Sequence, residues 1–163
     1  MNSRIDRFSN KISVNNGIAD AIVNKFYMEA EQKGITLHVK GHLPEPCNLS
    51  AFDLCTNKSN LLSNAIEAEY AAAGNDVYVE FRYTDREIML AVENDYKQDL
   101  EQENGVFFTT KEDKCNHGFG LENVKECVNK NHGQITIHTQ NYIFKVLVCV
   151  DNGENVDENS DCR

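Results

Sequence analysis

The sequence predicts an α+β fold, a two-layer sandwich in which one mixed, mainly antiparallel sheet is covered on one face by about three helices. Apolar residues recur at helical spacing in some segments and alternate with polar residues in others. These segments follow one another as helix, strand, helix, two strands, helix and two strands. The chain of 163 residues is long enough to form one domain with its own core.

Charge and composition argue against several classes of partner. The formal net charge of -10 argues against a nucleic-acid or anionic-membrane surface, because both require a basic face. No apolar run approaches the roughly 18 residues of a membrane span, and the N-terminus lacks the apolar core of a signal peptide. The cysteines form no C-x-x-C pair and the histidines no metal motif, which indicates reduced thiols in a cytoplasmic protein.

The first predicted helix begins after Asn16, which can cap it, and ends at Gly34. Its expected buried stripe consists of Ile18, Ile22, Phe26 and Ala30. Residues 1–16 are polar and have no clear period, so we interpret them as the remnant of an upstream helical segment or a flexible end. The domain itself is predicted to span residues 17–150.

Apolar and polar residues alternate over 35–39, which predicts a half-buried strand, and a loop with both prolines follows. Ser50 can cap the second helix, which runs to Gly74. The expected buried face of this helix consists of Leu54, Leu61, Ala65 and Ala68. Two alternating strands joined by a turn at 84–86 come next.

Residues 95–117 are polar with little periodicity, and a segment of that length inside a domain is typical of an active-site lid. A third helix is predicted over 118–133, and its inward residues are Leu121, Val124 and Val128. Residues 134–150 alternate as a final hairpin. The acidic tail, residues 151–163, has almost nothing apolar and is predicted to be disordered.

The second helix carries two asparagines, Asn60 and Asn64, one turn apart on the same face. Asparagine is a poor helix former, because its amide competes for backbone groups. One interpretation is a solvated helix face. The other is a row of amide oxygens offered to a hard cation such as Mg²⁺, which often shares its oxygen ligands with phosphates.

Three further features could carry chemistry. Gly118 and Gly120 flank a helix start, where free N–H groups suit a phosphate, although an ordinary turn-to-helix junction has the same pattern. Asn94 ends a strand, either as a polar exit or as an acceptor for an adenine amino group. In the lid segment, Lys111 and Lys114 can contact phosphates.

The order of these motifs resembles the ATP-binding module shared by gyrase, Hsp90, histidine kinases and MutL. "NLLSNAIEA" is similar to its N-box, "VEND" lies where its adenine-reading acidic motif falls, and "HGFGLENV" is similar to its glycine box. Within that superfamily, the chain most resembles the catalytic domain of the quorum-sensing and virulence sensor histidine kinases of Gram-positive bacteria. The resemblance covers residues 17–150 and implies the Bergerat-type ATP-binding fold.

The resemblance implies a role for each motif. Asn64 would ligate the Mg²⁺ that bridges the ATP phosphates. ATP-hydrolysing relatives carry a Glu base where this chain has Asn60, and an amide cannot take a proton at neutral pH. Asn94 would read adenine, although the usual D-x-G-x-G motif is absent. The other implied nucleotide-binding residues are Lys111, His117, Gly118, Phe119, Gly120 and Leu121.

We therefore interpret the chain as the ATP- and Mg²⁺-binding catalytic domain of a two-component sensor histidine kinase, the cytoplasmic part of a membrane-anchored sensor. It would donate the γ-phosphoryl to a histidine on a separate dimerisation domain, and a response regulator would act downstream. None of its own histidines lies in a phosphoacceptor pattern. Two alternatives stay open: a degenerate nucleotide-binding module that regulates a partner kinase, and an ATPase or anti-sigma-type serine kinase.

Overall fold

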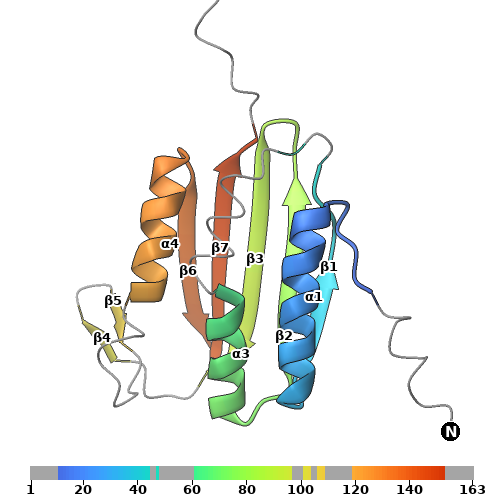
Figure 1. Cartoon of the computed structure of the whole chain (residues 1–163). Helices are drawn as coiled ribbons and strands as arrows, with labels where there is room; N and C mark the ends of the chain where they lie inside the picture. The colour runs from blue at the N-terminus through green and yellow to red at the C-terminus, as the bar shows by residue number, and fades with distance from the viewer. Residues whose placement is uncertain are drawn as a thin grey trace, which may run out of the picture.

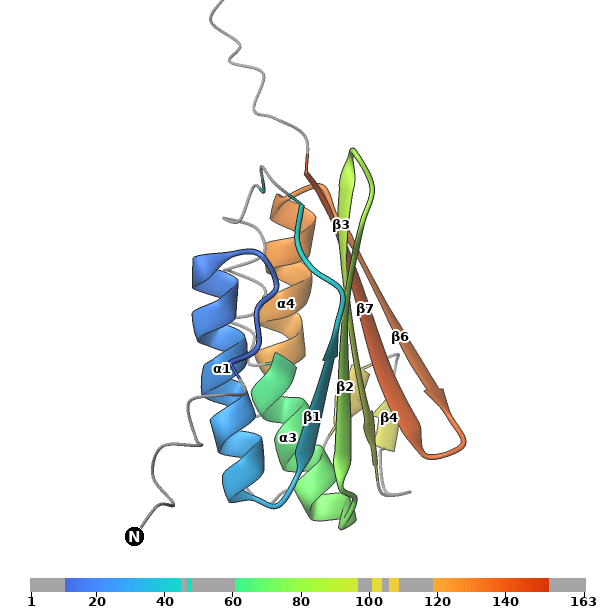
Figure 2. The same cartoon turned by 90° about the vertical axis from the view of Figure 1, so that its right-hand side faces the viewer.

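The computed structural model describes residues 11–44, 47, 61–96, 101–103, 106–108 and 119–152. These residues form two layers, with helices packed against one face of a five-stranded sheet (Figure 2). The predicted α+β two-layer sandwich is confirmed. No helix among the described residues combines the length and the apolar character that a membrane crossing requires.

The sheet has the strand order β1-β2-β3-β7-β6 (Figure 1). Its strands are β1 (Thr36–Lys40), β2 (Asp76–Tyr83), β3 (Glu87–Asp95), β6 (Gln134–Gln140) and β7 (Ile143–Asp151). β1 pairs with β2 in parallel, and the other neighbours are antiparallel, so the expected mixed and mainly antiparallel sheet is confirmed. The helix-facing side of the three central strands is formed by Val77, Val79, Phe81, Ile88, Leu90, Val92, Val146, Val148 and Val150.

The described helices are α1 (Gly17–Gln32), α3 (Leu61–Ala72) and α4 (Phe119–Lys130). α1 begins at the predicted cap, where the side-chain oxygen of Asn16 accepts the N–H groups of Ile18 and Ala19. The predicted stripe of α1 is partly wrong, because Ile18 is 53% exposed. On a helix of 3.6 residues per turn, each step of four residues rotates the side chain by about 40° around the helix axis. A continuous buried face therefore combines steps of three and four residues. The buried residues are Ala19, Val23, Phe26 and Ala30.

The predicted lid segment, residues 95–117, contains two short strands that the sequence did not predict. β4 (Glu101–Glu103) and β5 (Val106–Phe108) pair in a separate antiparallel sheet. Strands of three residues are too short for an alternating pattern to be recognised. The predicted start of the second helix at Ser50 lies outside the described residues.

Residues 11–16, upstream of the predicted domain start, contact the helix layer. Val14 is fully buried, and its N–H group donates to a carboxylate oxygen of Asp20 at 2.6 Å. The N–H of Leu43 donates to the Val14 carbonyl at 2.9 Å, which joins this segment to the chain that leaves β1. The tail beyond residue 152 lies outside the described residues.

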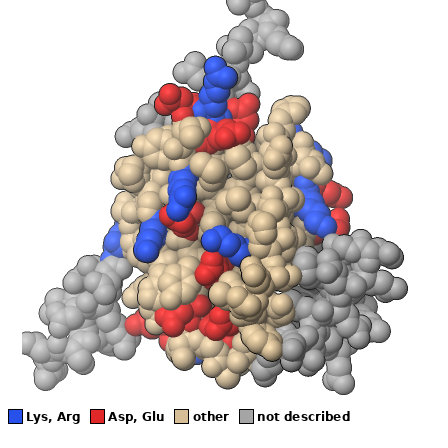
Figure 3. Space-filling model, turned by 180° about the vertical axis from the view of Figure 1, so that it is seen from behind, with Lys and Arg blue, Asp and Glu red and all other residues tan. Residues whose placement is uncertain are grey.

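The other face of the sheet is seen in Figure 3, where basic and acidic side chains lie close together. On this face Lys145 pairs with Glu93 at 3.0 Å, and Arg82 pairs with Glu80 at 2.8 Å. These pairs place opposite charges next to each other on this face.

Candidate functional site

Asn64 is held by a helix that is anchored in the core. α3 packs on the sheet through Leu61, Leu62, Ala65 and Ile66, all less than 5% exposed. Asn64 is half-buried beside this face, and Ala68, predicted to be in the core, is half-buried as well. A side chain in this position is fixed by the helix and still reachable by a ligand, as a metal ligand must be.

Asn94 lies at the C-terminal end of β3 and is only 4% exposed. Its amide nitrogen Nδ2 donates a hydrogen bond to the backbone oxygen of Asp95 at 2.7 Å. Within the described part of the chain, no group donates to the amide oxygen Oδ1 of Asn94. A buried acceptor left without a donor is costly, so this oxygen is suited to a donor that a ligand supplies.

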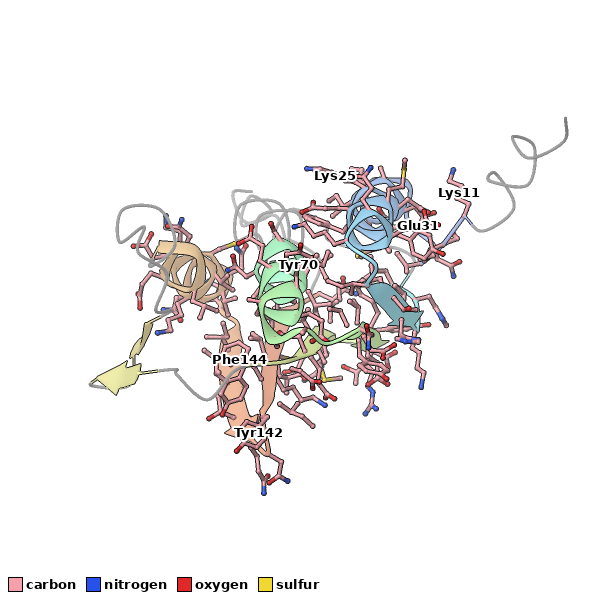
Figure 4. All side chains as sticks on the ribbon, turned by 90° about the horizontal axis from the view of Figure 1, so that it is seen from below. Lys11, Lys25, Glu31, Tyr70, Tyr142 and Phe144 are labelled. Carbon is pink, nitrogen blue, oxygen red and sulfur yellow. The ribbon has the colours of Figure 1, made fainter. Side chains whose placement is uncertain are left out.

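Aromatic side chains border Asn94. Phe144 of β7 lies opposite Asn94 in the strand register. The ring of Tyr96 lies 6.5 Å from the ring of Phe144 and 6.4 Å from that of Tyr142, measured between centroids. Figure 4 views this end of the molecule and shows Phe144 and Tyr142 close to each other. Flat aromatic faces beside one polar acceptor are features of a pocket for a planar base.

Glu69 is a site residue that the sequence pattern did not reveal. It lies on α3 and is 1% exposed, although an acid between alanine and tyrosine on a helix is expected to face water. One carboxylate oxygen accepts the N–H of Asp95 at 2.6 Å, and the other accepts the N–H of Asp76 at 3.1 Å. Glu69 therefore ties the helix that carries Asn64 to the strand end that carries Asn94.

The predicted glycine box coincides with the start of α4. Phe119 and Gly120 open the helix, and Leu121 is half-buried against the core. The first N–H groups of a helix have no partner within the helix and are attracted to anions. Glu122 shares this first turn, and its carboxylate pairs with Lys125 at 3.1 Å, which moderates its charge there. This helix start is therefore suited to a phosphate.

The described site residues gather at one end of the sheet. α3 contacts both β3 and α4. Figure 1 shows the C-terminal end of β3 and the start of α4 at the lower end of the sheet, on either side of α3. Several predicted site residues lie outside the described part of the chain, and their roles stay predictions: Asn60, Lys111, His117 and Gly118.

The Glu69 carboxyl predicts a pH dependence of stability. Burial raises the pKa of Glu69 above the usual 4.5, the N–H bonds from Asp95 and Asp76 lower it in part, and the charges of these two aspartates raise it again. Because the pKa in the folded protein is raised, the stability from protonated Glu69 is fully present below pH 4.5 and is lost as the pH rises through the raised pKa.

We expect the unfolding free energy of the wild type minus that of Glu69→Gln to fall as the pH rises from 4.5 through the raised pKa. Above that pKa the difference should be constant. Urea denaturation of both proteins at a series of pH values measures it. A difference that is the same at every pH would contradict the raised pKa.

Comparison with known proteins gives a family and a fold. The sequence matches the family model of the GHKL domain over residues 49–151, which is more than half of the chain. No sequence among the curated proteins matches the chain significantly.

Three solved structures of histidine kinases share this fold. The histidine kinase AdeS of Acinetobacter baumannii has a TM-score of 0.55 and 14% identity, with 83% of this chain matched to 66% of that one. The catalytic domain of histidine kinase ThkA has a TM-score of 0.58 and 12% identity, with 82% of this chain matched to 92% of that one. The blue-light activated histidine kinase EL346 of Erythrobacter litoralis has a TM-score of 0.60 and 13% identity, with 86% of this chain matched to 42% of that one.

At these identities the likeness shows a shared fold. The family model covers α3, β2, β3, α4, β6 and β7, and these include the elements that carry Asn64, Asn94 and the predicted glycine box. The chain belongs to the GHKL domain family.

Proposed function

We propose that this chain is the catalytic domain of a sensor histidine kinase. It binds ATP with Mg²⁺ and donates the γ-phosphoryl group to a histidine on a separate dimerisation domain. The observation that carries this proposal is the buried amide of Asn94, whose oxygen has no donor among the described residues. The adenine amino group is a donor of the right kind. Phe144 lies opposite Asn94 in the strand register, and the ring of Tyr96 lies 6.5 Å from that of Phe144, between centroids.

The residues present fit Mg²⁺ shared with phosphates. No group of three or more His, Cys, Asp or Glu that could hold a metal occurs among the described residues. Mg²⁺ commonly uses one or two protein oxygens together with substrate phosphates and water. Asn64 would supply the protein oxygen, and the metal would neutralise charge on the phosphates during transfer.

The protein groups are proposed to position the phosphates, with an amide in place of a base at residue 60. The start of α4 offers N–H groups to the phosphate chain, and Lys111, His117 and Gly118 are proposed to add to it. Asn60 stands where hydrolysing relatives have a glutamate, and its amide cannot take a proton from water. Transfer to a histidine that a partner presents is therefore favoured over hydrolysis.

The wider setting is part of the proposal. The similar structures are histidine kinases by name, and this chain spans 66% of the AdeS structure and 42% of the EL346 structure. A dimerisation domain that carries the histidine, and a response regulator downstream, are the partners we propose. The motifs favour the Gram-positive quorum-sensing type, with this domain on the cytoplasmic side of a membrane-anchored sensor.

The isolated chain tests the proposed chemistry. Incubated with Mg²⁺ and ATP labelled at the γ-phosphate, it should form no phosphohistidine and release no phosphate at a steady rate. Addition of a histidine-bearing dimerisation domain from a kinase of this type should give acid-labile label on that domain. Steady phosphate release by the chain alone would instead support an ATPase.

A second candidate function is a degenerate nucleotide-binding or interaction module, no longer able to hold ATP, that regulates a partner kinase. The absence of a D-x-G-x-G motif after β3 favours it, because the uncharged Asn94 replaces the usual aspartate. In that case calorimetry would show no binding of ATP with Mg²⁺. Binding that depends on Asn64 favours the kinase domain.

A further inference from the structure

Asn94 can read a base in two ways, and only one of them selects adenine. Its amide presents an acceptor oxygen on one side and a donor nitrogen on the other. The oxygen accepts from the adenine amino group, whereas the nitrogen would donate to the carbonyl oxygen that guanine carries at the same position. An aspartate has no such ambiguity. A chain with asparagine here requires something that fixes the orientation of the amide.

The hydrogen bonds around Asp95 supply that orientation. The backbone oxygen of Asp95 accepts the Nδ2 group of Asn94 at 2.7 Å, which leaves the oxygen of the amide for a ligand. The N–H of Asp95 donates to the carboxylate of Glu69 at 2.6 Å. Both polar groups of the Asp95 backbone are therefore hydrogen-bonded: the carbonyl to the Asn94 amide, and the N–H to the buried carboxylate of Glu69.

The carboxylate of Glu69 lies where the hydrogen-bonded pairing of β2 with β3 ends. The β2–β3 register ends with Tyr78 opposite Glu93. The N–H groups of Asp76 and Asp95 lie beyond that end, and the two oxygens of Glu69 accept them both. A side chain at Gly74 would collide with one of these oxygens, so the turn leaves the space that the carboxylate occupies.

We propose that Glu69 is a positioning residue that makes Asn94 specific for adenine. It holds the Asp95 peptide, and the Asp95 carbonyl holds the Asn94 amide with its oxygen toward the base. This relay of Glu69, Asp95 and Asn94 rests on the proposed nucleotide site and adds its base specificity. The role needs a carboxylate, because only an acceptor at both oxygens can take two N–H groups.

The test is calorimetry with ATP and with GTP, each with Mg²⁺, on the wild type and on Glu69→Gln. Glutamine has one acceptor oxygen for the two N–H groups and carries no charge, so the hydrogen bond from the Asp95 N–H is either lost or weakened to a bond with a neutral acceptor. We expect the affinity for ATP to fall about tenfold and that for GTP to be unchanged or higher, since a bond to a charged group is worth about that factor. Glu31→Gln, at an exposed acid of α1, is the control and should bind as the wild type does.

A double-mutant cycle separates the relay from a general loss of structure. Asn94→Leu replaces the amide with an apolar side chain of the same branched shape, which can neither donate nor accept a hydrogen bond, and should abolish the preference for ATP. In that background Glu69→Gln should not change the ratio of the two affinities further. If Glu69→Gln lowers both affinities equally in the protein with Asn94, Glu69 has only a structural role and the proposal is wrong.

Two other outcomes are decisive. Should Glu69→Gln fail to fold by circular dichroism, Gly74→Ala displaces the carboxylate without removing it and should lower the ATP preference in the same way. Equal binding of ATP and GTP by the wild type would overturn the relay alone. No binding of either nucleotide by the wild type would overturn the proposed function and the relay together.

Discussion

Asn64→Ala should lower the affinity for ATP in the presence of Mg²⁺ about a hundredfold, at the upper end of what removal of a supporting group at a metal site costs. The half-buried Asn64 is the proposed protein ligand, and alanine leaves the metal with phosphate and water oxygens only. α3 should stay intact, because alanine is the best helix former and the four core residues of the helix are untouched. Isothermal titration calorimetry measures the change.

The matched control is Ser63→Ala, one residue earlier on the same helix and also half-buried. It should bind ATP as the wild type does. With EDTA in place of Mg²⁺, the wild type and Asn64→Ala should bind equally weakly, because the difference between them depends on the metal. If Asn64→Ala binds ATP with Mg²⁺ as tightly as Ser63→Ala, Asn64 is a solvated helix residue and the metal assignment fails.

The sheet could be predicted from sequence because its strands have one buried face. Alternation at Val77, Val79 and Phe81 marks β2 without any knowledge of its neighbours. α1 was predicted for a similar reason, since Asn16 is a strong local capping signal. The prediction wrongly placed Ile18 in the buried stripe of α1. The sequence offers two adjacent stripes, and the position of the sheet beneath the helix decides which of them is buried.

The candidate site could be predicted only where local position was enough. A polar residue at the end of a buried strand pointed to Asn94, and a helix start next to Gly118 and Gly120 followed from the glycine pattern, with α4 beginning at Phe119. The buried Glu69 could not be predicted, because the N–H groups that satisfy it belong to strands that meet only in the fold. The orientation of the Asn94 amide likewise depends on the Asp95 carbonyl, which no spacing reveals.

Gly41→Ala should lower the free energy of unfolding by about 3 kcal/mol, a large part of the stability of one domain. Gly41 follows β1 with a φ of +79°, a conformation that costs a residue with a Cβ about 1 kcal/mol. A Cβ there would also collide with the backbone oxygen of Phe81 on β2, and such overpacking costs about 1–3 kcal/mol more. Backbone atoms cannot step aside as a flexible side chain can. Urea denaturation measures the loss.

Gly34→Ala is the matched control, because Gly34 has nearly the same φ, +73°, and nothing within 4 Å of an added Cβ. Gly34→Ala should lower the free energy of unfolding by about 1 kcal/mol, which is the cost of the positive φ alone. The difference between the two variants therefore isolates the close approach of Gly41 to Phe81. Phe81 pairs with Leu90, well before Asn94 along β3, so folded Gly41→Ala should still bind ATP as the wild type does. Equal losses of stability in the two variants would show that the contact at Phe81 costs nothing.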